Sequence, residues 1–227
     1  MKGLLALFPA LFLLLTSCSV PPRGLVETAP QPSTVIVLHG LFASPDHVEP
    51  LREGLAAQGI ICLSPDLQPS NGSLPIEAMA EQLDSFLQKN VPSNAPLQFV
   101  GHSMGGLVAL QYLQSATHAQ RCRGLFTIAT PHHGTFLANL HTGPAGRQML
   151  PNSPFTQNLN SRTPRFPVVT YRTPNDLVII PNSSSVLSFA ENKVIASPGH
   201  NEIVSSPELI EDLNRRILQH DIAAGVR

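Results

Sequence analysis

A serine between glycines is the clearest chemical feature of this chain. Ser103 is the centre of Gly101-His102-Ser103-Met104-Gly105, a G-x-S-x-G pentapeptide. An apolar run with strand character precedes it and a helix-like run follows it, which predicts a sharp strand-to-helix turn that exposes the serine hydroxyl. Glycines suit such a crowded turn, where side chains would strike the neighbouring strand or helix. Ser103 is therefore the candidate nucleophile.

The elements around the pentapeptide must support this reading, because composition alone would produce such a pattern in roughly one chain of this length in a dozen. Continuous apolar, β-branched runs indicate strands buried on both faces of a parallel sheet. Segments with helical spacing separate them. The expected strands are 34–38, 60–63, 97–100, 124–129, 167–171 and 192–196, and the expected helices are 45–58, 76–89, the run after the pentapeptide, and a last helix opened by a capping box from Ser205 to Glu208.

Three further motifs follow predicted strands. They are His39-Gly40-Leu41, Thr130-Pro131-His132-His133-Gly134 and the acid loop from Asp176 to Pro181. With the pentapeptide, these motifs make the chain resemble the bacterial triacylglycerol lipases and carboxylesterases of the α/β-hydrolase superfamily over residues 34–218. The match of the acid loop is loose in its spacing. The resemblance implies an α/β fold with a mostly parallel sheet, helices on both faces and a short cap insertion.

The same resemblance implies roles for two backbone groups. The N–H of Leu41 and the N–H of Met104, directly after the nucleophile, are expected to form an oxyanion hole. These are main-chain roles, so the side chains contribute shape rather than charge. His39 is expected to fix its loop by hydrogen bonding and to take no part in proton transfer.

Chain order selects the acid and the base. In this superfamily the nucleophile is followed by the acid and then by the histidine, each at the carboxyl end of a strand. The only carboxylate residues between Ser103 and His200 are Asp176 and Glu191. Glu191 precedes a predicted strand rather than following one. Of the two later histidines, His220 lies near the end of the last helix. Asp176 and His200 are therefore the predicted acid and base.

Other polar residues compete for these roles. His132 and His133 precede Asp176, so that either could act only by violating the chain order; we expect them to shape the pocket wall. Asp66 follows the second strand and is read as a loop and capping residue. Asn71-Gly72-Ser73 forms a loop whose small polar residues could face the site.

The predicted reaction is hydrolysis of a carboxylic ester through an acyl-enzyme. Phospholipase, thioesterase and acyltransferase activities on the same three residues stay open, because a fold does not select the leaving group. A rival from another class is a non-catalytic binding lipoprotein on a hydrolase scaffold. The substrate would be an ester or a lipid, with no metal and no organic cofactor.

Composition excludes some classes of function. The 227 residues are 42% hydrophobic, enough for one domain with a sizeable core. With 14 basic and 15 acidic residues the formal net charge is −1, so nucleic acid is not an expected partner. Cys and His show no metal-ligand spacing. The oligomeric state is not specified by these features.

The first residues read as an export signal. An apolar run of 12 residues, 4–15, is shorter than the roughly 20 needed to span a bilayer. Leu15-Thr16-Ser17-Cys18 resembles a bacterial lipobox, which predicts a signal peptide over 1–17 and lipidation of Cys18; an ordinary cleaved signal is the alternative. The prediction is an exported lipoprotein anchored to a membrane, on the periplasmic or outer-membrane face if the cell is Gram-negative, and otherwise a secreted protein.

The remaining segments complete the domain plan. Residues 18–33 are proline-rich and predict a flexible tether before a hydrolase domain over 34–220. Residues 136–165, which we call the cap, have weak periodicity and scattered apolar side chains, so they are either a moving lid with a hinge at 143–146 or a static insertion. Cys62 and Cys122 would lie three strand spacings apart, roughly 14 Å, and we expect two buried free thiols.

Overall fold

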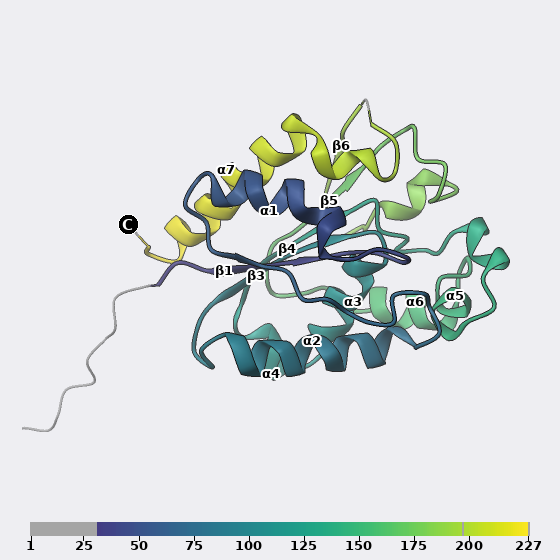
Figure 1. Cartoon of the computed structure of the whole chain (residues 1–227), viewed down its shortest axis with the longest axis horizontal. Coiled ribbons are helices and arrows are strands. Elements are labelled where there is room, and N and C mark those ends of the chain that lie inside the picture. Colours follow the sequence, from purple (N-terminus) through teal and green to yellow (C-terminus); the bar gives the residue numbers. More distant parts are fainter. Residues whose placement is uncertain (1–30, 197, 227) are drawn as a thin grey trace, which may run out of the picture.

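The computed structural model describes residues 31–196 and 198–226, which form a layered α/β domain (Figure 1). Its sheet has six strands in the order β2-β1-β3-β4-β5-β6, and every neighbouring pair is parallel. The predicted fold class is confirmed. The strands are β1 Thr34–Leu38, β2 Cys62–Leu63, β3 Leu97–His102, β4 Cys122–Ile128, β5 Val168–Arg172 and β6 Glu191–Val194.

Helices cover both faces of the sheet. On one face lie α1 (Glu49–Ala56) and α7 (Pro207–Ala223), and on the other lie α2 (Ile76–Asn90), α3 (Met104–Tyr112) and α4 (Ala116–Ala119) (Figure 1). Each face encloses its own cluster of buried apolar side chains. Short helices complete the fold: η1 Pro45–Val48, η2 Phe136–Leu140, α5 Pro144–Gln148, α6 Pro154–Asn160, η3 Asn182–Ser185 and η4 Glu202–Ser205.

Helix α2 illustrates how the sequence pattern becomes packing. Its apolar residues recur every three or four positions, and Ile76, Met79, Leu83 and Leu87 are all buried in the apolar cluster on this face of the sheet. Burying a side chain of this size stabilises the fold by about 1.5–3 kcal/mol. The helix packs against α3, so it supports the helix that begins directly after Ser103.

The central position of β3 determines where a site can form. It lies between β1 and β4, so the loops that follow these three parallel strands meet at one edge of the sheet. The cap helices α5 and α6 lie at the same end of the molecule (Figure 1). Functional groups on these loops are thereby brought together beneath the cap.

Several predicted boundaries differ from those of the structure. The helix expected over 45–58 is the 3-10 turn η1 followed by α1, which ends at Ala56, and the strand expected over 192–196 is β6, which ends at Val194. Two further differences have a clear local cause. The strand expected at 60–63 is reduced to Cys62–Leu63, because Gly59 turns the chain with φ +76° and β2 is an edge strand that pairs only with β1. The last helix is capped by Ser206, whose hydroxyl accepts the N–H of Leu209, and not by Ser205. Ser205 instead ends the short helix η4.

The two cysteines of the domain are free thiols, as predicted. Cys122 on β4 is buried, whereas Cys62 on β2 is only partly buried, so the expectation of two buried thiols is half correct. Burial raises the pKa of each thiol to about 12. Neither group is therefore an activated nucleophile.

The cap is a set of short helices packed on the domain. Gly143 touches the loop before α2 so closely that an added β-carbon would lie 2.3 Å from the carbonyl oxygen of Gly72. Gln148 of α5 accepts the N–H of Ile76 and donates to Glu77, which fastens α5 to the start of α2. Of the glycines considered as a hinge, Gly143 caps the start of α5 and Gly146 lies within it, and both are in close contact with neighbouring residues. This arrangement favours the static insertion.

The predicted signal peptide, the predicted lipidation site Cys18 and most of the predicted tether lie outside the described residues. Within the part of the chain that is described, no helix combines the length and apolar character needed to cross a bilayer.

Candidate active site

The turn around Ser103 has the strained geometry that its sequence predicts. Ser103 has φ 53° and ψ −126°, a conformation uncommon for a residue with a side chain. Its N–H donates to the carbonyl of Ile128 on β4 at 2.8 Å, which holds the turn in place. A β-carbon at Gly101 would lie 2.5 Å from Gly106, and one at Gly105 would lie 2.6 Å from the backbone of His39. Only glycine therefore fits at positions 101 and 105, two residues before and two residues after the serine.

His200 connects Ser103 to Asp176. Its Nε2 lies 3.1 Å from the Oγ of Ser103, and its Nδ1 lies 2.9 Å from the Oδ2 of Asp176. Because a carboxylate only accepts, Nδ1 carries the proton and Nε2 is free to accept the serine proton. All three side chains are buried, with relative exposures of 8%, 7% and 6% for the serine, histidine and aspartate. The structure brings together the three residues that chain order selected.

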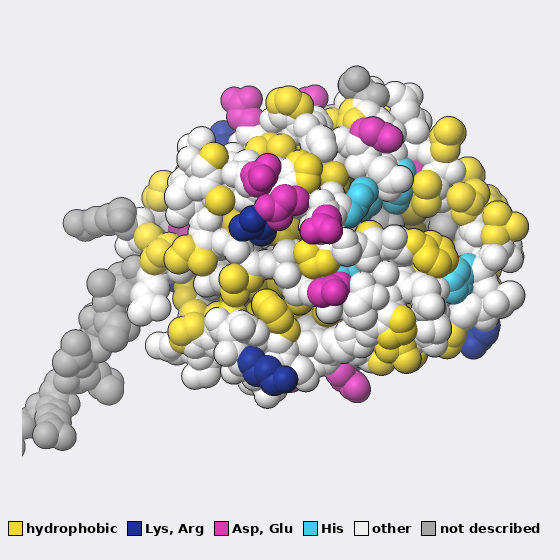
Figure 2. Space-filling view, viewed as in Figure 1, with side chains coloured by type: hydrophobic (Ala, Val, Ile, Leu, Met, Phe, Trp, Pro, Cys, Tyr) yellow, Lys and Arg dark blue, Asp and Glu magenta, His cyan; other side chains and the backbone are white. Residues whose placement is uncertain are grey.

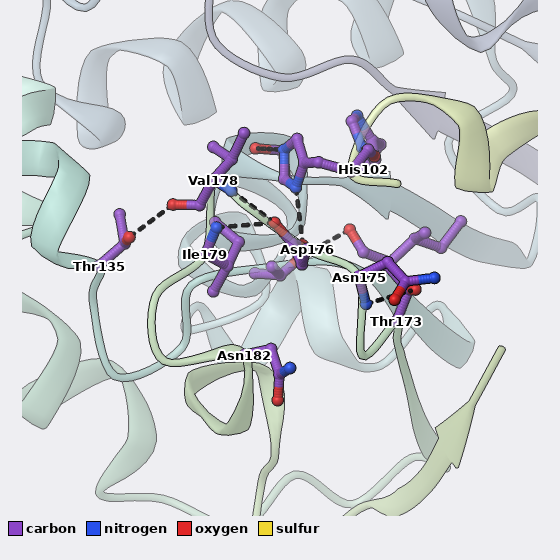
Figure 3. A network of polar contacts seen from close by, with 12 residues as sticks. His102, Thr135, Thr173, Asn175, Asp176, Val178, Ile179 and Asn182 are labelled. Carbon is purple, nitrogen blue, oxygen red and sulfur yellow. Dashed lines mark hydrogen bonds and ion pairs between the residues drawn. The ribbon is translucent and has the colours of Figure 1, made fainter. Parts of the chain in front are cut away.

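The carboxylate of Asp176 is held by its own loop. Its Oδ1 accepts the N–H groups of Val178 and Ile179, each at 2.8 Å, and Figure 3 shows both residues folded back onto the aspartate. Two backbone donors on one oxygen stabilise the negative charge and leave the other oxygen for His200. This loop is the one that matched its family motif only loosely, yet it supplies both donors.

Two threonines that the sequence did not single out fix the loops of the site. Thr135, after β4, donates from Oγ1 to the carbonyl of Val178 at 2.6 Å and accepts the N–H of Ile180 at 3.0 Å (Figure 3). Thr173 donates to the carbonyl of Pro198 at 2.6 Å, which joins the aspartate loop to the histidine loop. No sequence pattern marks them, because their partners are 25 to 45 positions away along the chain.

Two backbone N–H groups are placed beside the serine. Met104 is the first residue of α3, so its N–H has no acceptor within the helix, and the positive end of the helix lies at Ser103. The loop that carries Leu41 packs on the turn, since a β-carbon at Gly40 would lie 2.8 Å from the Cβ of Ser103. Both residues lie beside the serine, as an oxyanion hole would require.

His39 fixes this loop, as expected from the sequence. Its Nε2 accepts the N–H of Leu67 at 3.1 Å, so its Nδ1 carries the proton and donates to the carbonyl of Gly40 at 3.0 Å. Both ring nitrogens are therefore engaged with the backbone. This leaves His39 without a free nitrogen for proton transfer.

A cavity of about 660 Å³ opens over Ser103 and His200. Among the described residues its lining has four histidines but no Lys, Arg, Asp or Glu, and it is otherwise mostly apolar. The side chains at its rim include Phe42 and Leu140, which are 71% and 85% exposed. Figure 2 shows hydrophobic side chains gathered at the end of the molecule that carries the cap. The cavity therefore favours an uncharged, apolar ligand.

The prediction that His132 and His133 shape the pocket wall is wrong. Neither is among the residues that line the cavity, where Pro131 and Thr135 stand instead. His132 is fully buried behind the wall, 2.9 Å from the Oγ1 of Thr127, and burial lowers its pKa to about 3. His133 points to the carbonyl of Val186. The tight turn after β4 directs both rings away from the cavity.

The remaining polar candidates also lie elsewhere. Asp66 is exposed and accepts from the side chain of Gln68, and Asn71 contacts His141 of the cap through its carbonyl at 2.7 Å. Glu191 starts β6 and binds Arg216, and His220 on α7 contacts Gln98. In residues 31–196 and 198–226, no group of three or more His, Cys, Asp or Glu side chains is arranged to hold a metal ion.

Comparison with known proteins agrees with this architecture. A family model described as "alpha/beta hydrolase fold" matches residues 33–216. No curated protein matches the chain by sequence.

Solved structures resemble the chain at low sequence identity. Lipase B of Aspergillus fumigatus aligns with a TM-score of 0.71 and 16% identity over 81% of this chain, which spans only 52% of that lipase. A thermophilic esterase from Thermogutta terrifontis aligns at 0.65 with 17% identity, covering 85% of this chain and 92% of the esterase. The lipase BlEst2 of Bacillus licheniformis aligns at 0.65 with 16% identity, covering 84% and 96%. At such identities the likeness shows the fold alone.

Proposed function

Because the chain belongs to the α/β-hydrolase fold family, we propose that it is a serine hydrolase that cleaves carboxylic esters through an acyl-enzyme. The observation that carries this proposal is the position of His200, within hydrogen-bonding distance of both Ser103 and Asp176 at the floor of an apolar cavity. A serine is a weak nucleophile by itself, and a histidine oriented by a carboxylate is the arrangement that activates it.

The proposed reaction uses each of these groups in turn. His200 accepts the proton of Ser103 through Nε2 as the serine oxygen attacks the ester carbonyl, and Asp176 stabilises the imidazolium that forms. The N–H groups of Leu41 and Met104 bind the oxyanion of the tetrahedral intermediate. His200 then gives the proton to the departing alcohol. Water repeats the sequence on the acyl-enzyme and releases the acid.

The cavity supports an uncharged acyl ester over the other substrates that the sequence left open. A phospholipid headgroup or a coenzyme A thioester carries phosphate, which basic side chains ordinarily bind. No Lys or Arg lines the cavity within the described residues. Two of the similar solved structures are named lipases and one an esterase. A non-catalytic scaffold has no need for the alignment of Ser103, His200 and Asp176.

The substrate class is tested by the rates of hydrolysis of p-nitrophenyl esters from acetyl to palmitoyl. Cleavage of these esters supports the proposal, and sustained rates on the long chains would support a lipase. A profile that falls steeply beyond butyryl would instead indicate a short-chain esterase. No cleavage of any ester, together with no reaction with a fluorophosphonate, would revive the binding lipoprotein.

We further propose that the protein is exported and anchored to a membrane through a lipidated Cys18, with residues 18–33 as the tether. The proposal is supported by the apolar run that ends in Leu15-Thr16-Ser17-Cys18. Acyl chains anchor by burying CH₂ groups, so that membrane attachment would need no spanning helix.

A further inference from the structure

His102, the residue before the proposed nucleophile, is a buried histidine that the mechanism above does not use. It is the last residue of β3 and only 2% exposed. Its ring lies between the rings of His47 and His200, with centroids 4.9 Å from each. Figure 3 shows His102 close to the group of residues around Asp176. A side chain in this position contacts the proposed base directly and forms a small part of the cavity wall.

The hydrogen bond of His102 fixes its tautomer. Its Nε2 lies 2.9 Å from the backbone carbonyl oxygen of His200. A carbonyl only accepts, so Nε2 carries the proton and donates it. The other nitrogen, Nδ1, is buried and has no hydrogen-bond partner among the described residues. Burial, and then the neighbouring His200, lower the pKa of His102 well below its ordinary value, so the ring is neutral.

An unpartnered buried nitrogen is unfavourable, and an apolar side chain at this position would avoid it. Unlike an apolar side chain, the imidazole donates a hydrogen bond to the backbone carbonyl of His200. This contact is direct: it joins the backbone of the proposed base to the residue next to the proposed nucleophile. Thr173 fastens the same loop from the other side through the carbonyl of Pro198.

The distance most sensitive to this contact is the 3.1 Å between Nε2 of His200 and Oγ of Ser103. Proton transfer requires that these atoms stay within hydrogen-bonding reach. We infer that His102 is a positioning residue, which holds the backbone of His200 so that its ring stays in line with Ser103. The inference rests on the proposed function, and it adds a residue whose side chain touches no substrate atom in the mechanism.

The test compares two substitutions in the full-length chain. His102→Gln can place its Nε2 donor near the position of the histidine Nε2, whereas His102→Leu fills similar space without a donor. Because a displaced base slows the chemical step, we expect kcat of His102→Leu on p-nitrophenyl butyrate to fall about 10- to 100-fold. KM should change less than kcat, because His102 lines the cavity with only 2% of its surface exposed and the lost hydrogen bond runs to the backbone of His200. His102→Gln should recover most of the loss.

His118 provides a matched control. Its ring also hydrogen-bonds a backbone carbonyl, that of Tyr112 at 3.0 Å, but on helix α4. His118→Leu should keep the wild-type kcat, and thermal unfolding of each variant separates lost stability from lost turnover. Equal losses in His102→Leu and His102→Gln, or no loss in His102→Leu, would overturn the inference.

A readout that needs no substrate keeps this test apart from that of the proposed function. Imidazole ¹⁵N chemical shifts of the wild-type chain should report a neutral His102 protonated at Nε2. The downfield proton signal of His200 Nδ1–H should be broadened or lost in His102→Leu and kept in His102→Gln. A proton on Nδ1 of His102, or an unchanged His200 signal in His102→Leu, would overturn the inference. If the wild-type chain hydrolyses no ester, the proposed function fails, and these spectra still decide the role of His102.

Discussion

Gly40 packs on Ser103 so tightly that a β-carbon at position 40 would lie 2.8 Å from the Cβ of the serine. Real β-carbons essentially never approach this closely, and the Cβ of Ser103 cannot swing away as the end of a long side chain could. The loop that presents the Leu41 N–H can therefore pack closely on the nucleophile only because residue 40 is a glycine.

Gly40→Ala should consequently displace this loop and weaken catalysis. We expect kcat on p-nitrophenyl butyrate to fall about 10- to 100-fold, the range expected when one oxyanion donor or the alignment of the site is lost. Gly59→Ala is the control, because its left-handed backbone is strained by a side chain but no atom lies within 4 Å of the added carbon. It should lower the melting temperature and spare kcat. Wild-type turnover in Gly40→Ala would contradict the proposed oxyanion hole.

Asp176→Asn should keep the fold and lose most of the activity. The amide cannot hold His200 in the tautomer with the proton on Nδ1, nor stabilise the imidazolium. We expect kcat/KM to fall about 10³- to 10⁴-fold. Glu81→Gln, at an exposed carboxylate on α2, should retain the wild-type value. A decrease of less than about tenfold in Asp176→Asn would remove the aspartate from the mechanism.

The parts of the site that depend on local sequence could be predicted, whereas the parts that depend on contacts between separate loops could not. The strand-to-helix turn at Ser103 is specified locally by its glycines, and the carboxylate and histidine follow from chain order because few candidates exist. Thr135 and Thr173 could not be predicted, because their roles depend on how separate loops meet.

The wrong predictions have equally local causes. His132 and His133 were expected at the pocket wall because they follow a strand, but the turn after β4 points both rings away from the cavity. Ser205 and Ser206 are equally good capping residues by type. The short helix η4 uses the first, so that the second caps α7.

Buried His132 should make the stability of the domain depend on pH. Burial lowers its pKa to about 3 in the folded chain, from an ordinary value of 6.5. Between these values the unfolded chain binds a proton here that the folded chain does not, so the free energy of unfolding decreases as the pH falls below about 6.5. Lowering the pH from 8 to 5 should cost about 2 kcal/mol through this residue.

Urea unfolding of His132→Gln at the two pH values checks this. Gln can still bind Thr127 but does not titrate, so the difference in unfolding free energy between the two conditions should shrink by about 2 kcal/mol. His133→Gln, at the exposed neighbour, should leave the difference unchanged. An unaltered pH dependence in His132→Gln would mean that the folded chain protonates His132 as readily as the unfolded one.

Cys18→Ser tests the proposed anchor. If Cys18 carries the acyl chains, the variant cannot be lipidated and should move from the membrane fraction to the soluble fraction of cells. Mass spectrometry of the wild-type N-terminus should find a diacylated cysteine as the first residue. Ser17→Gly keeps a small residue before the cysteine and should stay in the membrane fraction. An unchanged distribution of Cys18→Ser would refute the anchor.

The central claim is that Ser103 is the nucleophile, and Ser103→Ala tests it most directly. Removing one hydroxyl leaves the cavity and the His200–Asp176 pair in place, so that the variant should still fold. The account predicts that the wild-type chain hydrolyses p-nitrophenyl butyrate and forms a fluorophosphonate adduct on Ser103, located by peptide mass spectrometry. Ser103→Ala should form no adduct and lose the hydrolysis. Wild-type hydrolysis by Ser103→Ala, or an adduct on another residue, would contradict the account.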